Sequence, residues 1–434
     1  MRNVFVLGLD DFNRHELRSI SEAESCRFVG LLGYDEIVRP ESGEIPFEKL
    51  RRKAEEQLDR HGGSVDGIIA FWDFPSSAMA GVLRNARGLP GPSNEAIARC
   101  EHKYWSRLEQ REVVPELVPA FCAVDPFADD PVSQLTIEYP FWIKPVKAHS
   151  SRLGFRIHNE SELRDHLAEI REKIGFFGRP FGEYLQHVDV PEEIRRVDGY
   201  WCIAESIISA GRQCTLEGYV RQGATTVYGV VDSIRQGKHR SCFARYQYPS
   251  SLPRRIQRRM IRAAELVMQR FRYDGGPFNM EFFWDPRTDR ISLLEVNARI
   301  SKSHCPIFRL VDGAANHEVA VELALGREPQ FPHRQGEFRL AAKFMIRVFR
   351  DGIVRRMPSA AQLAEIRARY PEARFRPLAE PGDRLAHSHH RDSYSFELGD
   401  LFLGAVDQQE LLAKYDDCLR TLSFEVEPIE RDAA

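Results

Sequence analysis

The chain has 434 residues, of which 43% are hydrophobic and 29% charged, and its formal net charge is −3 at pH 7. This length supports about two to four domains with large cores, and the balanced charge gives no reason to expect a nucleic-acid or membrane partner. The eight cysteines are scattered without a C-x-x-C pair. That pattern favours free buried thiols over disulfides or a zinc site, so we expect a folded, cytoplasmic protein.

Residues 1–95 alternate strand and helix signals, which predicts a parallel α/β domain. The signals fall at Val4–Leu7, Phe12–Glu22, Phe28–Leu32, Phe47–His61 and Gly67–Phe71. Asp73 follows the third strand signal, at the kind of strand end where α/β folds place ligands, and is a candidate substrate contact. The turn-rich segment Gly88–Asn94 closes this region.

Two lysines in the following region are candidates for binding an anion. Lys144 interrupts the apolar strand signal Phe141–Val146, and a lysine inside such a strand usually has a partner. Both a nucleotide phosphate and a buried carboxylate remain open as that partner. Lys103 lies on a predicted helix, where a surface position is the alternative. The polar loop Lys147–Phe155, which contains Ser150, offers donors that could cover phosphates, although a plain hairpin turn is equally open.

The segment Cys202–Gly223 is predicted to form a strand, a small-residue turn and a second strand. Glu205 ends its first apolar run, and Ile207 and Ile208 follow. An extended segment of this kind can present backbone groups to a purine edge while aliphatic side chains cover the faces of the base. An ordinary hairpin is the alternative.

A β-hairpin is predicted from Phe278–Trp284 and Ile291–Asn297, which are joined by the turn-rich segment DPRTDR. Side chains alternate along a strand, so Glu295 and Asn297 share one face, and the expected register sets Glu281 opposite Glu295. Facing carboxylates repel, and a bound cation removes that cost. Two carboxylates and an amide oxygen suit Mg²⁺ that also holds phosphate oxygens; a solvated acidic face is the alternative.

These elements, taken in this order, resemble the ATP-grasp superfamily of ATP-dependent ligases. The resemblance is carried by FNMEFF…LLEVNARIS, by FWIKPV and by CIAESIISAGRQCTLEGYV, and it covers roughly residues 1–330. It implies an α/β fold with α+β parts in three domains. These are an N-terminal parallel α/β domain over 1–95, a two-lobed ATP-grasp core over 96–335 with the nucleotide between two sheets, and a β-rich C-terminal lobe over 336–434.

The resemblance also implies a role for each candidate residue of the nucleotide site. Contacts to ATP are implied for Lys103, Lys144, Ser150, Glu205, Ile207, Ile208 and Gln213. Gln213 stands where the family often has a ribose-binding glutamate, and it can still hydrogen-bond a hydroxyl without the charge. Glu281, Glu295 and Asn297 would hold Mg²⁺, with Mn²⁺ as the alternative ion. Arg299 and Lys144 would act on the transferred phosphoryl group.

The implied activity is an ATP- and Mg²⁺-dependent ligase that activates a carboxylate as an acyl phosphate and joins it to an amine, with release of ADP and phosphate. The alternatives are a biotin-carboxylase-like enzyme that activates bicarbonate and a non-catalytic ATP-binding regulatory subunit. The partners would be a small-molecule carboxylate and amine, and the C-terminal lobe could support a homodimer. The candidate substrate contacts are Asp73, Arg245, Tyr248, Ser301 and His304.

Overall fold

The computed structural model describes residues 1–40, 43–148, 152–236, 242–388 and 395–429, and it divides into two compact units. The first unit comprises Met1–Tyr228, Pro253–Lys302 and His317–Phe331, and the second comprises Gly229–Leu252, Ser303–Asn316 and Pro332–Ala434. The mixed α/β architecture that the sequence predicts is confirmed. The structure groups residues 1–95 with the residues that follow them, so the predicted three-domain division remains a prediction.

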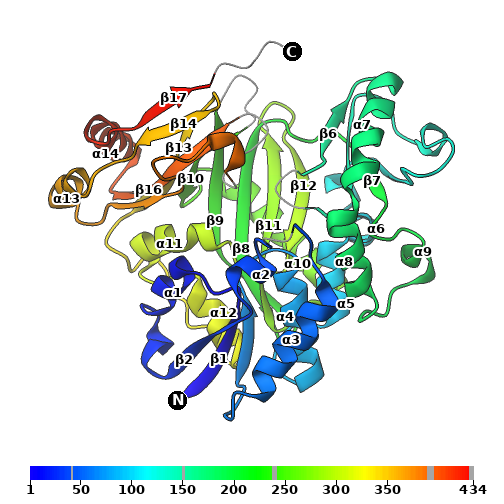
Figure 1. The fold of residues 1–434 in the computed structure, drawn as a ribbon, viewed down its shortest axis with the longest axis horizontal. Helices are drawn as coiled ribbons and strands as arrows, with labels where there is room; N and C mark the ends of the chain where they lie inside the picture. Colours follow the sequence, from blue (N-terminus) through cyan, green and yellow to red (C-terminus); the bar gives the residue numbers. More distant parts are fainter. Residues whose placement is uncertain (41–42, 149–151, 237–241, 389–394, 430–434) are drawn as a thin grey trace. The chain divides into compact units, whose positions relative to one another are not determined.

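The first unit begins with a three-stranded parallel sheet, as the sequence predicts, and its strand order is β2-β1-β3. Its strands are β1 (Arg2–Leu7), β2 (Cys26–Leu31) and β3 (Gly67–Ala70). The helices of this region are α1 (Asp11–Leu17), α2 (Tyr34–Ile37), α3 (Phe47–Asp59) and α4 (Ser76–Arg87), and Figure 1 shows α3 and α4 in blue beside the sheet. On α3 the buried residues Phe47, Leu50, Ala54 and Leu58 recur at helical spacing, which fixes the face that it buries.

A second sheet of the first unit is antiparallel, in the order β4-β7-β5-β6. Its strands are β4 (Phe121–Val124), β5 (Phe141–Pro145), β6 (Phe155–Ile157) and β7 (Cys202–Ser206). The helices before and between these strands are α5 (Asn94–Glu101), α6 (Lys103–Val113), α7 (Glu160–Lys173), α8 (Gly175–Leu185) and α9 (Glu192–Arg195). The inward residues of this sheet form a core with one face of α7, through Leu163, Leu167 and Ile170.

A third sheet of the first unit runs β12-β11-β8 and continues into β9. Its strands are β8 (Arg212–Arg221), β9 (Ala224–Gln236), β11 (Gly276–Asp285) and β12 (Arg290–Asn297), and its helices include α10 (Arg254–Arg270) and α12 (His317–Ala324). β7 and β8 are consecutive in the chain but belong to different sheets. The ordinary hairpin that the sequence left open for Cys202–Gly223 is therefore excluded.

The second unit is β-rich, as predicted for the end of the chain. In this unit the remainder of β9 pairs with β10 (Cys242–Tyr248), and the sheet goes on in the order β13 (Leu340–Val348), β16 (Phe396–Ala405) and β15 (Arg374–Pro377). A separate pair consists of β14 (Gly352–Arg356) and β17 (Glu425–Pro428). The helices are α11 (Cys305–Asp312), α13 (Ala360–Arg369) and α14 (Gln408–Thr421). Residues of β13, β16, α13 and α14 share one core that includes Phe344, Leu401, Ile366 and Leu411.

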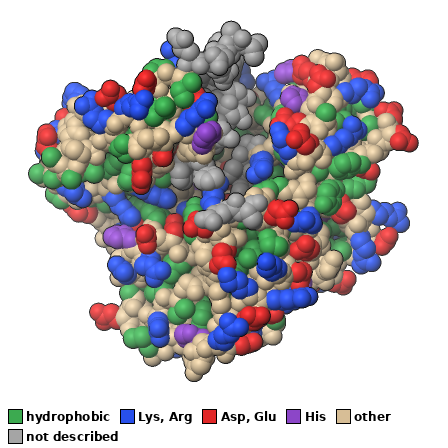
Figure 2. Space-filling view, in the orientation of Figure 1, with side chains coloured by type: hydrophobic (Ala, Val, Ile, Leu, Met, Phe, Trp, Pro, Cys, Tyr) green, Lys and Arg blue, Asp and Glu red, His purple; other side chains and the backbone are tan. Residues whose placement is uncertain are grey.

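Three chain-wide expectations can be compared with the structure. All eight cysteines are buried and free, as predicted. Within the described residues, no helix is long and apolar enough to cross a bilayer. On the face drawn in Figure 2, acidic and basic side chains are interspersed, and neither sign gathers into a large patch among the coloured atoms.

Candidate active site

The hairpin of β11 and β12 places Glu281 directly opposite Glu295, which confirms the predicted pairing. The register shifts between Glu281 and Phe282, which pairs with Leu293, so Leu294 is the extra residue of a β-bulge. Both carboxylates are half-buried. Glu281 Oε2 accepts a hydrogen bond from Gln213 Nε2 at 2.8 Å, which offsets part of its negative charge.

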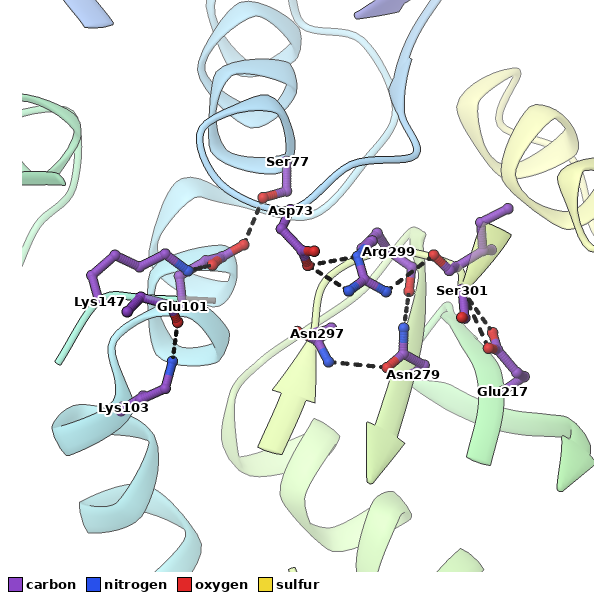
Figure 3. Close-up of polar contacts among 12 residues, drawn as sticks. Asp73, Ser77, Glu101, Lys103, Lys147, Glu217, Asn279, Asn297, Arg299 and Ser301 are labelled. Carbon is purple, nitrogen blue, oxygen red and sulfur yellow. Dashed lines mark hydrogen bonds and ion pairs between the residues drawn. The ribbon is translucent and has the colours of Figure 1, made fainter. Parts of the chain in front are cut away.

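Asn297 lies at the end of β12 and is oriented by its neighbours. Its Nδ2 donates to Asn279 Oδ1 at 3.0 Å, and Asn279 Nδ2 donates to the backbone oxygen of Arg299 at 3.1 Å (Figure 3). Because the amide nitrogen of Asn297 is used in this chain of hydrogen bonds, Oδ1 is the atom that it can offer to a cation. Asn279 is a positioning residue that the sequence did not indicate.

These three side chains fit a magnesium ion that is shared with a nucleotide. Within the described residues, no group of three or more histidine, cysteine or acidic side chains could hold a metal ion. Two carboxylates and one amide oxygen form an incomplete set, and Mg²⁺ is commonly bound by one or two carboxylates plus substrate phosphates. Glu281, Glu295 and Asn297 are therefore suited to a metal that arrives with ATP.

Lys103 begins α6, and its Nζ donates to the backbone oxygen of Ala148 at 2.6 Å. Burial lowers the pKa of Lys103 to about 8; Lys147 and Lys144 add to this lowering, while Glu295 and Glu101 oppose it. Lys103 therefore lies within electrostatic range of Lys144 and of Glu295, a candidate metal ligand. A concentration of ammonium groups beside acidic oxygens is suited to binding a phosphate chain with its cation.

Lys147 is a further buried ammonium that sequence reasoning placed only at the edge of a polar loop. It forms an ion pair with Glu101, whose other oxygen accepts a hydrogen bond from Ser77 Oγ at 2.6 Å. Figure 3 shows Lys103 and Lys147 on one side of the start of α4, with Arg299, Asn279 and Asn297 on the other. The sequence did contain a signal for Lys147, because this lysine directly follows the predicted strand that carries Lys144.

Glu205 lies on β7 with only 4% of its surface exposed, and two cations bind it. Its Oε1 accepts from Arg107 Nε at 2.5 Å, and its Oε2 pairs with Lys144 Nζ at 2.5 Å. Burial would raise the pKa of this carboxyl, but Arg107 and Lys144 outweigh it and lower the pKa to about 2. A buried carboxylate, one of the two partners left open for Lys144, is therefore present.

Arg107 was missed by sequence reasoning, although it stands four residues after Lys103 on the same face of α6. Besides Glu205, its guanidinium donates to the backbone oxygens of Leu293 at 3.0 Å and Leu294 at 2.7 Å. Arg107 thus connects the carboxylate of β7 to the bulge of β12, immediately before Glu295. Only 3% of its surface is exposed.

Ile207 and Ile208 lie half-buried in the connection from β7 to β8. Because these strands belong to different sheets, the connection is a crossing between sheets, which is the setting that the resemblance implies for an adenine contact. Gln213, predicted near the ribose, instead donates its amide hydrogen to Glu281. Ser150, together with residues 149 and 151, lies outside the described residues.

Arg299 and Asp73 form a partly buried ion pair, with Arg299 Nε donating to Asp73 Oδ1 at 2.8 Å. Burial lowers the pKa of Arg299, but Asp73, Glu217 and Glu295 outweigh it and raise that pKa above the ordinary value. Asp73 lies between β3 and α4, at the predicted strand end. The structure thus joins a predicted substrate contact to the predicted phosphoryl contact.

The other candidate substrate contacts have varied surroundings. The backbone nitrogen of Ser301 donates to both oxygens of Glu217, at 3.2 and 3.3 Å. In the second unit, His304 packs edge-on against Tyr246, with ring centroids 4.9 Å apart. Tyr248 is 2% exposed, lies 4.6 Å from the ring of Phe308 and bonds to Asp312, which indicates a packing role in place of substrate contact.

Arg245 lies on β10 three residues before Tyr248, so the two side chains point to opposite faces of the strand. Its guanidinium lies 5.5 Å from the centroid of Phe344, and its buried Nε has no hydrogen-bond partner among the described residues. Both Arg245 and Tyr248 were predicted from the sequence as candidate substrate contacts. The alternation of the strand separates them, and only Arg245 keeps a donor for that role.

Comparison with known proteins bears on these arrangements. A family described as "Carbamoyl-phosphate synthase L chain, ATP binding domain" matches residues 237–330. The solved structure of an L-amino acid ligase from Bacillus licheniformis has a TM-score of 0.72, covers 98% of both chains and is 16% identical in sequence. The chain has the ATP-grasp fold. The fold confirms the resemblance to the ATP-grasp superfamily that was inferred from the hairpin and strand motifs.

Two further similar proteins extend the comparison. The biotin carboxylase domain of 2-oxoglutarate carboxylase from Hydrogenobacter thermophilus, solved in complex with MgADP and bicarbonate, has a TM-score of 0.62 and 13% identity, covering 98% of this chain and 91% of that one. The C-terminal section of the carbamoyl phosphate synthase large chain from Methanopyrus kandleri is 23% identical over 231 residues. The match covers 51% of this chain and 38% of that relative's length.

Proposed function

We propose that this protein is an ATP- and Mg²⁺-dependent ligase that phosphorylates a carboxylate and joins the resulting acyl phosphate to an amine. The observation that carries the proposal is the meeting of three groups around Glu295 in one compact unit. Glu281 faces it across the hairpin, while Lys103 and Arg299 interact with it electrostatically. This brings the metal, phosphate and phosphoryl-transfer roles to one place.

The nucleotide is proposed to bind with its base at the connection from β7 to β8 and its phosphates toward Lys103 and Lys144. Phosphoryl transfer depends mainly on positioning and on stabilisation of negative charge, so it requires no covalent nucleophile from the protein. A bound Mg²⁺ would neutralise charge on the phosphate oxygens. The lysines would hold the chain of phosphates, and Arg299 would orient the group that is transferred.

The proposed reaction has two steps. A carboxylate oxygen of the first substrate takes the γ-phosphoryl group, which gives an acyl phosphate and ADP. The nitrogen of the second substrate then attacks the acyl carbon, phosphate leaves, and the nitrogen loses a proton. Arg299 would serve both steps, because its guanidinium, now paired with Asp73, could instead pair with the acyl phosphate.

A second candidate reaction uses bicarbonate as the carboxylate that is phosphorylated. It is favoured by the likeness to a biotin carboxylase domain that was solved with bicarbonate. The match to the L-amino acid ligase has a TM-score of 0.72, against 0.62 for the biotin carboxylase domain. It also spans 98% of the ligase chain, whereas the other match spans 91% of the carboxylase chain. We therefore rank amino acids and other small carboxylates first. Activity with Mn²⁺, a homodimer and a cytoplasmic location remain predictions.

The experiment that tests this function is a screen for ADP and phosphate release with ATP and Mg²⁺. Amino acids and small carboxylates are offered in pairs, and bicarbonate is offered with the same amines. Equal amounts of ADP and phosphate that appear only with one pair support the ligase and identify its substrates. AMP and pyrophosphate would contradict acyl phosphate chemistry, and ADP release that needs bicarbonate would favour the second candidate.

A further inference from the structure

A buried carboxylate, Glu217 on β8, lies next to the candidate metal site on the same face of the sheet. In the order β12-β11-β8, Glu217 lies opposite Asn279, and Asn279 lies opposite Asn297. Glu281 and Glu295 lie two positions away on β11 and β12, and side chains two positions apart on a strand share one face. Glu217 therefore belongs to the row of side chains beside the two acidic candidates for binding Mg²⁺.

The row that contains Glu217 holds the backbone that carries Arg299. Asn279 Nδ2 donates to the backbone oxygen of Arg299 at 3.1 Å. Two residues along the chain, the backbone nitrogen of Ser301 donates to both oxygens of Glu217, at 3.2 and 3.3 Å (Figure 3). Both peptide groups of Ile300, the buried residue between them, are thus held. This restricts the directions that the neighbouring Arg299 side chain can take.

Glu217 also acts on Arg299 through its charge. Burial lowers the pKa of the Arg299 guanidinium, but Asp73, Glu217 and Glu295 outweigh burial and raise that pKa. None of the surface of Glu217 is exposed, and a buried carboxylate needs hydrogen-bond donors and a nearby cation to offset its loss of water. The backbone of Ser301 is one such donor, and Arg299 is such a cation. Glu217 and Arg299 therefore stabilise each other.

We propose that Glu217 is a positioning residue for Arg299, whose backbone it fixes and whose charge it balances during phosphoryl transfer. The inference rests on the proposed function, since it gives Glu217 a part only in the steps that Arg299 serves. Because Glu217 has no exposed surface, it acts on the reaction through Arg299 and not by contact with a substrate. It should therefore affect the rate of turnover and leave the affinity for ATP unchanged.

The test is a double-mutant cycle made of Glu217→Gln, Arg299→Lys and the variant with both changes. ADP release is measured with ATP, Mg²⁺ and the substrate pair that the screen identifies. Since a small misplacement of a reacting group can cost up to about a hundredfold, Glu217→Gln should lower kcat about tenfold or more, with KM for ATP unchanged. In the Arg299→Lys background the same change should have less than about a twofold effect, because the effects of residues that act together are not additive.

Glu318→Gln is the matched control. Glu318 on α12 is 6% exposed and accepts a hydrogen bond from the backbone nitrogen of Ser21 at 3.2 Å. Its substitution therefore removes a buried carboxylate that holds a backbone nitrogen in the same unit, at a place to which no part in the reaction is assigned. Urea unfolding measures the stability of both variants. A fall in kcat in Glu217→Gln alone, at similar losses of stability, separates positioning from a general weakening of the fold.

Two kinetic results would overturn the proposal. One is a kcat for Glu217→Gln equal to that of the natural chain. The other is a loss of kcat in the double variant that equals the product of the two single losses, because Glu217 would then act independently of Arg299. If Glu217→Gln does not fold, Glu217→Asp takes its place in the cycle, since it keeps the buried charge but withdraws the oxygens from Ser301.

A crystal structure of the variant separates this proposal from the proposed function, because it requires no substrate. Absence of ADP release from the natural chain with every pair would count against the ligase and not against the positioning role. Loss of the 2.8 Å bond from Arg299 Nε to Asp73 Oδ1 in the variant supports that role. An Arg299 that keeps this bond in the variant overturns it.

Discussion

Two parts of the candidate active site differ in how their charges are organised. In the β11–β12 hairpin, Glu281 and Glu295 carry like charges and face each other. At β7, Glu205 is already neutralised by Arg107 and Lys144. We propose that a cation from outside completes the first arrangement, whereas the second is complete within the protein. Like charges that face each other therefore mark the place where ligand chemistry is expected, while a charge that is neutralised within the protein supports the geometry around it.

The largest effect should come from Glu295→Gln. Removing this charge takes away the carboxylate that faces Glu281 and interacts with Lys103 and Arg299, so turnover should fall on the order of 10²–10³-fold or more. ADP release measures the loss, and a thermal midpoint at least as high as that of the natural chain would show that the fold is intact. Asp285→Asn, at the far end of the same hairpin, is the control and should remain active. An active Glu295→Gln enzyme would contradict the metal-site assignment.

Glu205→Gln should act on stability first. It leaves Arg107 buried without its acid, and breaking a buried ion pair in this way costs about 3–5 kcal/mol. Urea unfolding measures the change, with the exposed Glu160→Gln as a control that leaves the midpoint unchanged. If Glu205→Gln unfolds at the same urea concentration but binds ATP poorly, the carboxylate contacts the nucleotide and the supporting role is wrong.

Asp73→Asn should have a smaller effect, on turnover and not on the fold. Hydrogen bonds to charged groups contribute roughly 1.5–3 kcal/mol, so a weaker hold on Arg299 should lower kcat about tenfold. Comparison of kcat with KM for ATP locates the effect, because a residue that positions Arg299 changes kcat and leaves ATP binding intact. Unchanged kcat would mean that this pair has no part in the reaction.

The smallest effect concerns pH. The pKa of Lys103 is lowered to about 8, so the cation is largely present at pH 7, about half present near pH 8, and lost as the pH rises further. The affinity for ATP should therefore decline severalfold from pH 7 to pH 9, measured by titration calorimetry at constant ionic strength. Lys103→Arg keeps its charge throughout this range and should remove the decline. A decline of the same size in Lys103→Arg would assign it to another group.

The parts of the site that the sequence predicted are those fixed by local geometry. The Glu281–Glu295 pairing was predicted from strand alternation across a short turn. The bulge at Leu294, which the sequence did not predict, lies between the turn and that pair and sets Glu295 opposite Glu281. The alternating signals of residues 1–95 likewise gave the parallel sheet in its correct order of elements.

The parts that the sequence did not predict depend on distant partners. Arg107 and Glu205 are separated by 98 positions in the chain, and Lys147 and Glu101 by 46. No local pattern reveals such pairs, because each member alone is consistent with a surface position or with a ligand contact. The sequence did not predict the two compact units for the same reason, because each unit is assembled from three separate segments of the chain.

The most direct test of the central claim is a crystal structure with Mg²⁺ and a non-hydrolysable ATP analogue. The account predicts a metal ion about 2.0–2.1 Å from oxygens of both Glu281 and Glu295, with phosphate oxygens completing its coordination and Lys103 bound to the same phosphates. A nucleotide bound away from β12, or one bound there without a metal between these two carboxylates, would contradict it.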